Sequence, residues 1–149
     1  AAGVLDKPLA AGEESTTKRI YEHEKGFNND ESAMDGVFVE SADIDITDGD
    51  RFVFLKRILP DILFVNEAGT SQNPAINVVV KRRDFNNQTL STDSTTQITA
   101  SSTFSSLRSR ARQFVLRFES DDDNTDSDRK NYKWRLGSTR VDIQPSGRR

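Results

Sequence analysis

The chain has no cysteine and only one histidine among its 149 residues, and these two shortages exclude several kinds of site. Without cysteine there is neither a disulfide framework nor a thiolate metal site. The histidine, His23, lies among Glu22, Glu24 and Lys25. One histidine cannot supply a typical zinc site, and its place in a charged N-terminal segment argues against a catalytic triad. We therefore interpret His23 as a solvated side chain.

Long apolar runs are missing as well. No stretch approaches the roughly 20 consecutive apolar residues that a membrane helix needs, so we expect a soluble chain with no membrane anchor. The opening "AAGVLDKPLAAG" lacks the basic start and long apolar centre of a secretory signal, and it begins with Ala rather than Met. These features fit a chain that is processed or that is part of a longer protein. No Gly-rich or Walker-type phosphate loop occurs either.

The apolar residues that are present are unevenly distributed. They make up 22 of the 44 residues from 37 to 80, but only 12 of the first 36. We therefore predict an N-terminal arm or linker over residues 1–36 and one ordered domain over residues 37–149, which is long enough to bury a core. Within the arm, residues 20–25 fit either a short strand or a charged helix.

Alternation of apolar and polar residues runs through most of residues 37–149 and predicts strands, because successive side chains of a strand point to opposite faces. A half-buried strand is expected over "VFVESADIDI", and similar strands follow along the chain. The sets predicted to face inward are Phe38, Ala42, Ile44 and Ile46; Ile76, Val78 and Val80; Phe114, Leu116 and Phe118; Tyr132, Trp134 and Leu136; and Val141 and Ile143.

Two segments depart from simple alternation. The run "RFVFLKRIL" is apolar on both sides, which predicts a strand covered on both faces, with Ile58 on the side opposite to Val53 and Leu55. The Ser- and Thr-rich segment after Phe85 predicts a loop, a short edge strand near residues 97–100, and a turn. Short strands at this spacing, without any long helical period, predict an all-β fold. We expect an antiparallel β-sandwich or jelly roll with an extended N-terminal arm.

Six carboxylates crowd residues 119–128, "ESDDDNTDSD", and raise the question of a calcium site. A loop of the EF-hand type needs a glycine at its sixth position and a glutamate at its twelfth. Counting from Asp121 or from Asp122, both are missing. An irregular site built from Asp121, Asp123 and Asp126 stays open, but we favour the solvated tip of a β-hairpin, which tolerates such charge in water. Hence no metal site is predicted.

Paired carboxylates also occur on the expected strands. Glu40 with Asp43, or Asp43 with Asp45, could serve as the acid and base of a glycosidase, which lie about 5 to 10 Å apart. Strand alternation produces many such pairs by accident, so we interpret them as the solvent-facing side of a strand. No catalytic residue is predicted.

Charge is divided between the two parts of the chain. Residues 1–50 hold 13 acidic and 4 basic residues, whereas residues 51–149 hold 11 acidic and 17 basic ones. This polarity fits head-to-tail packing of copies, in which an acidic arm lies on a basic neighbour. Scattered surface charge is the simpler reading, because isolated surface pairs contribute little.

Arginines alternate on one predicted strand, where they could follow the phosphates of a nucleic acid. The neighbouring aromatic residues fall on the opposite, buried face, so the stacking platform that single-stranded nucleic acid requires is missing. A subunit interface is the favoured use, because Arg is enriched where protein surfaces meet. The residues predicted at this interface are Arg108, Arg110, Arg112, Arg117 and Arg135.

Four segments in this order carry a family resemblance: "FVESADIDITDGDRFVFLKRILPDILF", "INVVVKRRDF", "RSRARQFVLRFESDDDN" and "KWRLGSTRVDIQPSGRR". Over residues 37–149 the chain resembles the C-terminal region of tail nozzle (tail tubular) proteins of short-tailed bacteriophages. Those proteins form a ring that extends the conduit through which DNA leaves, and they are much longer than this chain. The resemblance therefore implies a fragment, or a separate small virion protein that shares the terminal module.

The resemblance also implies the partners and location of the chain. It predicts a non-enzymatic structural protein of the virion tail, without a cofactor, that assembles with identical copies in a ring. Other tail proteins, such as an adaptor or a fibre, would lie beside it, and DNA would touch it only in passing. Two other classes stay open on the residues alone: a carbohydrate-binding or calcium-stabilised adhesion module, and a fragment of a glycan hydrolase.

Overall fold

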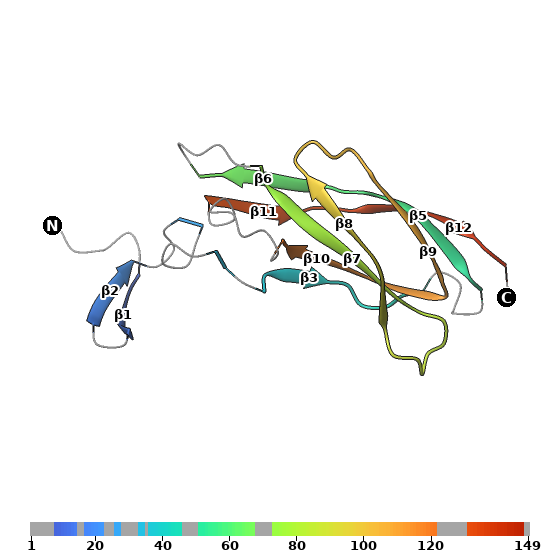
Figure 1. The fold of residues 1–149 in the computed structure, drawn as a ribbon, viewed down its shortest axis with the longest axis horizontal. Coiled ribbons are helices and arrows are strands. Elements are labelled where there is room, and N and C mark those ends of the chain that lie inside the picture. The colour runs from blue at the N-terminus through green and yellow to red at the C-terminus, as the bar shows by residue number, and fades with distance from the viewer. Residues whose placement is uncertain are drawn as a thin grey trace.

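The computed structural model of the protein describes residues 8–14, 17–22, 26–27, 33–34, 36–45, 51–67, 73–121 and 131–147. These residues form strands in antiparallel sheets and no α-helix (Figure 1), so the all-β prediction is confirmed. They contain no helix of the length and apolar character that crossing a membrane takes. The strands are β1 (Leu9–Glu14), β2 (Thr17–Glu22), β3 (Phe38–Glu40), β4 (Ile44–Asp45), β5 (Val53–Leu59), β6 (Ile62–Asn66), β7 (Ala75–Arg83), β8 (Ser91–Thr99), β9 (Ser105–Ala111), β10 (Gln113–Ser120), β11 (Tyr132–Leu136) and β12 (Arg140–Pro145).

Two layers of strands make up the domain. The first is a five-stranded sheet in the order β3, β10, β7, β8, with β4 also pairing with β10. The second contains the sheet β12–β5–β9 and the pair β11–β6. β6 follows β5 past Pro60, and β12 follows β11 past Gly137. At this bend the Gly137 amide donates to the Asp61 carbonyl at 2.7 Å, and the Ser138 amide donates to the Asp61 carboxylate at 2.9 Å.

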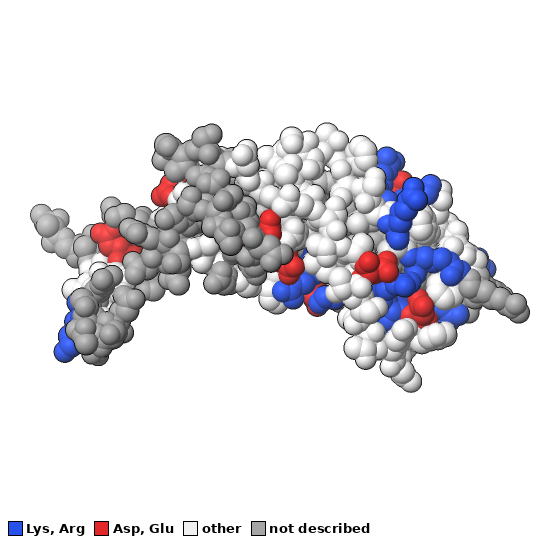
Figure 2. Space-filling model, in the orientation of Figure 1, with Lys and Arg blue, Asp and Glu red and all other residues white. Residues whose placement is uncertain are grey.

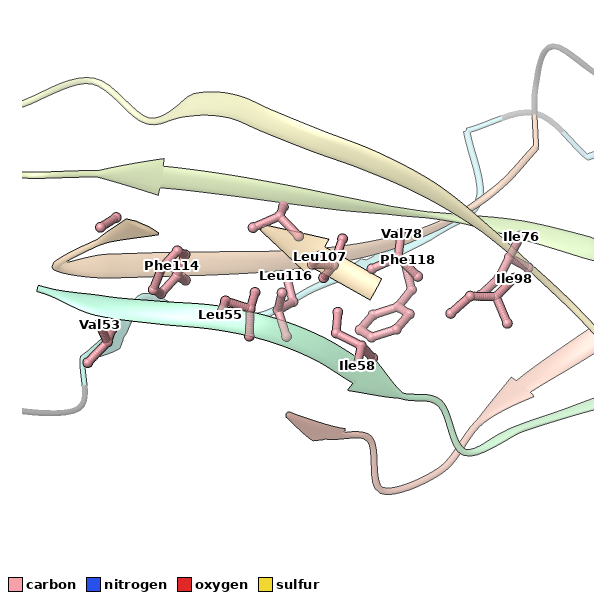
Figure 3. Packing of buried hydrophobic residues seen from close by; sticks show 12 residues of the cluster. Val53, Leu55, Ile58, Ile76, Val78, Ile98, Leu107, Phe114, Leu116 and Phe118 are labelled. Atoms are coloured by element: carbon pink, nitrogen blue, oxygen red, sulfur yellow. The ribbon is translucent and has the colours of Figure 1, made fainter. Parts of the chain in front are cut away.

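The hydrophobic core fills the space between the layers. In Figure 3, apolar side chains of β5 and β9 from one layer and of β7, β8 and β10 from the other point toward this space. The sets predicted at Ile76–Val80 and Phe114–Phe118 are confirmed as buried. Burying such a side chain stabilises the fold by about 1.5–3 kcal/mol. The core residues are Val53, Leu55, Ile58, Ile76, Val78, Val80, Ile98, Leu107, Ala111, Phe114, Leu116 and Phe118, with Ile44, Ile62, Phe64, Trp134, Leu136, Val141 and Ile143 packed against them.

Strand β5 corrects one prediction. Ile58 lies in the core with Val53 and Leu55 rather than on the opposite side of the strand. The register of β5 with both β9 and β12 shifts between Leu55 and Arg57, as in a β-bulge. One extra residue in a strand reverses the alternation beyond it, so strict period-two counting gave the wrong face for Ile58.

Two further strand predictions were wrong in detail. β8 is an edge strand as expected, but it spans nine residues, Ser91–Thr99, rather than a short segment near residue 98. The predicted half-buried strand over residues 37–46 is interrupted, because only β3 and β4 pair with β10. Phe38 is 49% exposed and Ala42 is exposed, whereas Ile44 is half-buried against the core as predicted. Edge strands such as β3 have a neighbour on one side only, which leaves their side chains less covered.

The acidic segment does not close a hairpin, which is a further correction. β10, before it, pairs with β3, β4 and β7, whereas β11, after it, pairs with β6 in the other layer. The segment therefore connects the two layers. Which strands pair with each other depends on contacts between residues that are distant in sequence. Two alternating runs that are neighbours in the sequence, β10 and β11, were therefore wrongly predicted to pair with each other. Residues 122–130 themselves lie outside the described residues.

The N-terminal arm contains a β-hairpin. β1 and β2 pair with each other from Leu9 with Glu22 to Glu14 with Thr17. Of the two interpretations left open for residues 20–25, the strand is confirmed as far as Glu22, and residues 23–25 lie outside the described part. The hairpin stands at one end of the molecule, away from the two layers, while the C-terminus lies at the other end (Figure 1).

Candidate interaction surface

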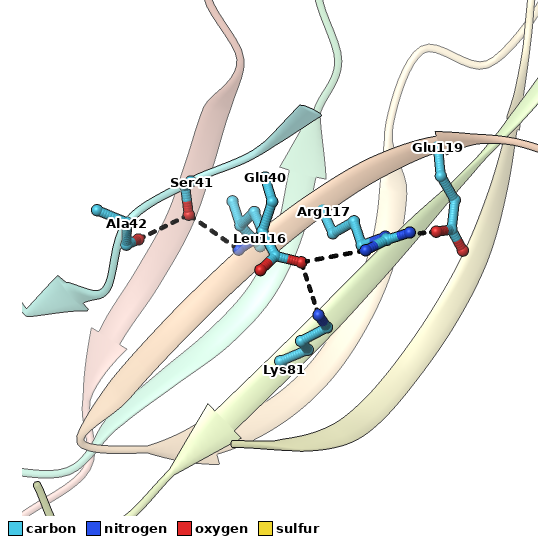
Figure 4. A network of polar contacts seen from close by, with 7 residues as sticks. All are labelled: Glu40, Ser41, Ala42, Lys81, Leu116, Arg117 and Glu119. Atoms are coloured by element: carbon cyan, nitrogen blue, oxygen red, sulfur yellow. Dashed lines mark hydrogen bonds and ion pairs between the residues drawn. The ribbon is translucent and has the colours of Figure 1, made fainter. Parts of the chain in front are cut away.

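On the outer face of the five-stranded sheet, basic side chains are paired within the chain. Glu40 on β3 accepts a hydrogen bond from the Lys81 ammonium at 2.6 Å and lies 3.6 Å from the Arg117 guanidinium (Figure 4). Arg117 also binds Glu119, and its guanidinium covers the ring of Phe38 at 3.7 Å. This cross-strand network joins β3, β7 and β10 and neutralises the two cations.

The same network shifts two pKa values. The hydrogen bond from Lys81, with the nearby charge of Arg117, lowers the pKa of the Glu40 carboxyl below its ordinary value of 4.5. The hydrogen bond and charge of Glu119, with Glu40 beyond, raise the pKa of the Arg117 guanidinium. Both shifts favour the charged forms, as expected of a structural ion pair.

The other carboxylates that were considered as a catalytic pair also have partners within the chain. Asp43 binds the Arg83 guanidinium, and the Asp45 carboxylate accepts a hydrogen bond from Gln113 at 3.3 Å. With Glu40, they fasten β3, β4 and the turn between them to β7 and β10. Part of the acidic charge of residues 1–50 is therefore balanced by basic residues of the same chain.

The outer face of the other sheet, β12–β5–β9, differs. Lys56, Arg108 and Arg140 are exposed there, and none of them has an acidic partner among the described residues. Arg57 is the exception, since its Nε donates to Asp142 at 3.0 Å. We call this surface, with Lys56, Arg57, Arg108 and Arg140, the basic face. Figure 2 shows basic side chains gathered at the end of the molecule that carries the C-terminus.

Next to the basic face, where β9 turns into β10, two arginines and two phenylalanines form a stack. The guanidinium of Arg110 lies 4.1 Å from the ring centre of Phe52, and that of Arg112 lies 5.0 Å from it. Arg112 also lies 5.2 Å from the ring centre of Phe85, which is 62% exposed. Such contacts contribute about 0.5–2 kcal/mol each. We call Phe52, Phe85, Arg110 and Arg112 the arginine corner.

The two arginines of this corner are bonded differently. Arg110 donates from Nε to the hydroxyl of Ser146 at 2.9 Å and from Nη2 to the Ser146 carbonyl at 3.2 Å. It thereby fixes the C-terminal segment to β9. The Nε of Arg112 is buried and has no hydrogen-bond partner in the described part of the chain. A buried guanidinium N–H without an acceptor is unfavourable, and no carboxylate pairs with Arg112 in the described part of the chain.

The structure brings three of the five predicted interface residues together. Arg108, Arg110 and Arg112 follow one another along β9 and its corner. Arg117 lies on the other sheet in the ion-pair network, and Arg135 is exposed on β11. Sequence reasoning missed the aromatic members of the corner, because it weighed only the aromatic residues beside the arginines, whereas Phe52 and Phe85 are distant from Arg112 in the sequence.

Asp121, one of the candidate calcium ligands, is a structural residue. It is only 7% exposed and accepts hydrogen bonds from the side-chain amides of Asn77 at 3.1 Å and Gln97 at 2.8 Å. It thus joins the end of β10 to β7 and β8. Among the residues that the structure describes, no three His, Asp or Glu side chains converge in the way that metal ligands do. Asp123 and Asp126 lie outside that part.

An apolar groove of about 500 Å³ lies between β3 and β11. Its walls are fixed by two hydrogen bonds, from the Tyr132 hydroxyl to the Ala75 carbonyl at 2.8 Å and from the Trp134 indole to the Ser120 hydroxyl at 3.0 Å. The ammonium of Lys133 lies 4.6 Å above the ring of an arm residue, Phe27. The lining residues are Phe27, Met34, Val37, Val39, Ser120, Tyr132, Lys133, Trp134, Leu136 and Gly137.

No protein-family model matches the chain, and no curated protein is similar to it in sequence. The fold, the basic face and the arginine corner are therefore the observations from which a function is inferred.

Proposed function

We propose that the chain is a structural virion protein, a module of a phage tail nozzle or tail-tube assembly that extends the DNA exit channel. In this role it binds identical copies through the basic face, forms a ring with them, and carries out no chemical reaction. Other tail proteins, such as an adaptor or a fibre, are its further neighbours, and DNA touches it only in passing.

The observation that carries this proposal is the difference between the two outer faces. On the five-stranded sheet, Lys81, Arg83 and Arg117 each have a carboxylate partner. On the basic face, Lys56, Arg108 and Arg140 have none among the described residues. Unpaired cations on one exposed sheet do not stabilise the monomer, but they attract and orient an acidic surface.

The resemblance of residues 37–149 to nozzle proteins supports the same role, because it rests on the order of strand motifs that the sandwich contains. Two layers of strands packed on a shared core suit a component that must hold its shape around a channel. The acidic arm and the basic face give each copy two unlike surfaces. Contacts between unlike surfaces build closed rings when the rotation between copies closes.

The test is charge reversal on the basic face. We expect sedimentation velocity to show oligomers of the wild-type chain at low ionic strength that dissociate as salt is added, since exposed charges are screened. R108E combined with R140E should lower the oligomer fraction strongly. R135E, the matched control, changes the charge by the same amount per residue on β11 and should leave the fraction unchanged. Equal loss in both variants would contradict the assignment of the contact to the basic face.

One observation favours a second function, a carbohydrate-binding module. The groove between β3 and β11 presents the rings of Phe27, Tyr132 and Trp134, and aromatic rings are common platforms for ligands. The Tyr132 hydroxyl and the Trp134 indole already donate to Ala75 and Ser120, so the described lining offers a sugar few hydrogen bonds, and this function ranks second. Trp134 is the sole tryptophan. Its fluorescence should change on titration with a bound glycan, and no change across a set of glycans would remove this function.

A further inference from the structure

We propose that the arginine corner of one copy binds a carboxylate from the acidic arm, residues 1–36, of a second copy. This inference rests on the proposed assembly of copies and adds the contact through which neighbouring copies engage. The receiving group is the guanidinium of Arg112, and the occupant is an Asp or Glu side chain of the neighbouring arm.

The surroundings of Arg112 suit a carboxylate. Phe52 and Phe85 both lie near its guanidinium, at 5.0 Å and 5.2 Å from the ring centres. The rings hold the planar group in place, while its buried Nε lacks a hydrogen-bond partner in the described residues. A guanidinium presents parallel N–H groups that match the two oxygens of a carboxylate, and such bonds are stronger than neutral ones.

Neighbouring arginines show what Arg112 lacks. Arg82 lies 2.7 Å from the Asp93 carboxylate, and Arg83 binds Asp43. Both are therefore neutralised within the chain, one residue apart at the end of β7. Arg112 has only aromatic contacts and no carboxylate in the part that the structure describes. A carboxylate from outside would therefore find there a cation with no acidic partner in the described part of the chain.

The arm supplies the negative charge. Residues 1–36 contain eight acidic and four basic residues. The acidic residues that follow, Glu40, Asp43 and Asp45, already have partners in the sandwich. Residues 1–36 thus carry a net negative charge, which is complementary to the positive charge of the corner.

The position of the arm favours a neighbouring copy over the same chain. The β1–β2 hairpin lies at one end of the molecule, and the end of β9 lies near the C-terminus at the other end (Figure 1). The Arg110 bonds to Ser146 agree with this placement of the corner. An arm at one end and a receptor at the other produce head-to-tail contacts, the arrangement that builds rings or filaments.

A mixing experiment tests this geometry with full-length chains. One variant, R112A, keeps its arm but loses the receptor. The other, the amide-arm variant, keeps Arg112 but has all eight acidic residues of residues 1–36 replaced by Asn or Gln. We expect each variant to sediment as a monomer where the wild type associates. Mixed in equal amounts, they should form a dimer with one chain of each, because the R112A arm fits the intact corner of the other variant.

Two controls separate the effect of the parallel guanidinium N–H groups from the effects of charge and of folding. R112K keeps the positive charge but loses the parallel N–H groups, and we expect it to weaken association by roughly tenfold or more. Circular dichroism and the melting temperature of each variant show whether the sandwich is retained. If R112A unfolds, R112K and the amide-arm variant still decide the question.

The outcomes distinguish this inference from the function on which it rests. Association of R112K and the amide-arm variant at wild-type strength would overturn the contact, while assembly through the basic face would stand. Failure of the mixed variants to pair would overturn it too. A wild-type chain that stays monomeric at every concentration, alone and with other tail proteins, would overturn both.

Discussion

Replacing Asp121 with Ala should destabilise the sandwich markedly, although Asp121 begins a segment that resembles a solvated acidic loop. Asp121 is only 7% exposed, and its carboxylate accepts hydrogen bonds from Asn77 and Gln97. These bonds hold the ends of three adjacent strands together. The Ala variant removes the acceptor and leaves both amides without it.

The magnitude follows from the two bonds. A hydrogen bond to a charged group contributes about 1.5–3 kcal/mol, and an unsatisfied buried donor costs a similar amount. Gln97 is exposed, so water can replace its lost acceptor, whereas Asn77 is half-buried. We therefore expect the Ala variant to lose about 2–4 kcal/mol of unfolding free energy. An Asn variant retains one acceptor oxygen and should lose about half as much.

Urea unfolding followed by the fluorescence of Trp134 measures this loss. The matched control is Asp142→Ala, which removes the exposed ion pair with Arg57 and should cost no more than about 1 kcal/mol. Equal losses for the Asp121 and Asp142 variants would refute the structural role of Asp121. So would a rise in wild-type stability with calcium that the Asp121 variant abolishes, because a metal ligand and not an amide acceptor would then be lost.

Three further predictions concern packing and charge. Ser109 is fully buried, and its hydroxyl has no partner in the described part of the chain. Ser109→Ala should therefore stabilise the protein by about 1 kcal/mol in urea unfolding. Ser105→Ala is the control: it removes a hydroxyl that is hydrogen-bonded to Thr96 and should destabilise the protein by a similar amount. In the same assay, Ile58→Ala should lower the unfolding free energy by about 2–5 kcal/mol, because Ile58 is fully buried. Leu63→Ala, at an exposed site, should lower it by less than about 1 kcal/mol. Equal losses in the two variants would contradict the described core. Because the folded pKa of Glu40 is lowered, its contribution is present above pH 4.5 and is lost as the pH falls through the folded value. The stability difference between wild type and Glu40→Gln should therefore shrink in acid, and a difference that grows there would have the wrong sign.

Local patterns predicted the central strands well. Ile76, Val78 and Val80 lie on β7, which has neighbours on both sides, so one side of the strand faces the core along its length. The same counting gave the wrong face for Ile58, because a shift of register in β5 depends on its partners and leaves no mark in composition. It shortened β8 because only Ile98 of that edge strand is deeply buried.

The candidate site was predictable only in part. Alternation placed Arg108, Arg110 and Arg112 on one strand, but only the first two lie on β9, and Arg112 lies just beyond it, at the corner before β10. The rings that hold Arg112 come from distant segments, before β5 and after β7, so their meeting depends on how the two layers pack. Which strands pair with β10 and with β11, on either side of the acidic segment, likewise depends on contacts between residues that are distant in sequence. Sequence alone therefore indicated which residues carry charge, but not which of them already have partners.

Electron microscopy of the purified full-length chain at low ionic strength tests the central claim most directly. The account predicts closed oligomers in which the basic face and arginine corner of each copy meet the N-terminal arm of the next. Particles that are single copies under all conditions, or an assembly that leaves Lys56, Arg108, Arg112 and Arg140 in solvent, would contradict it.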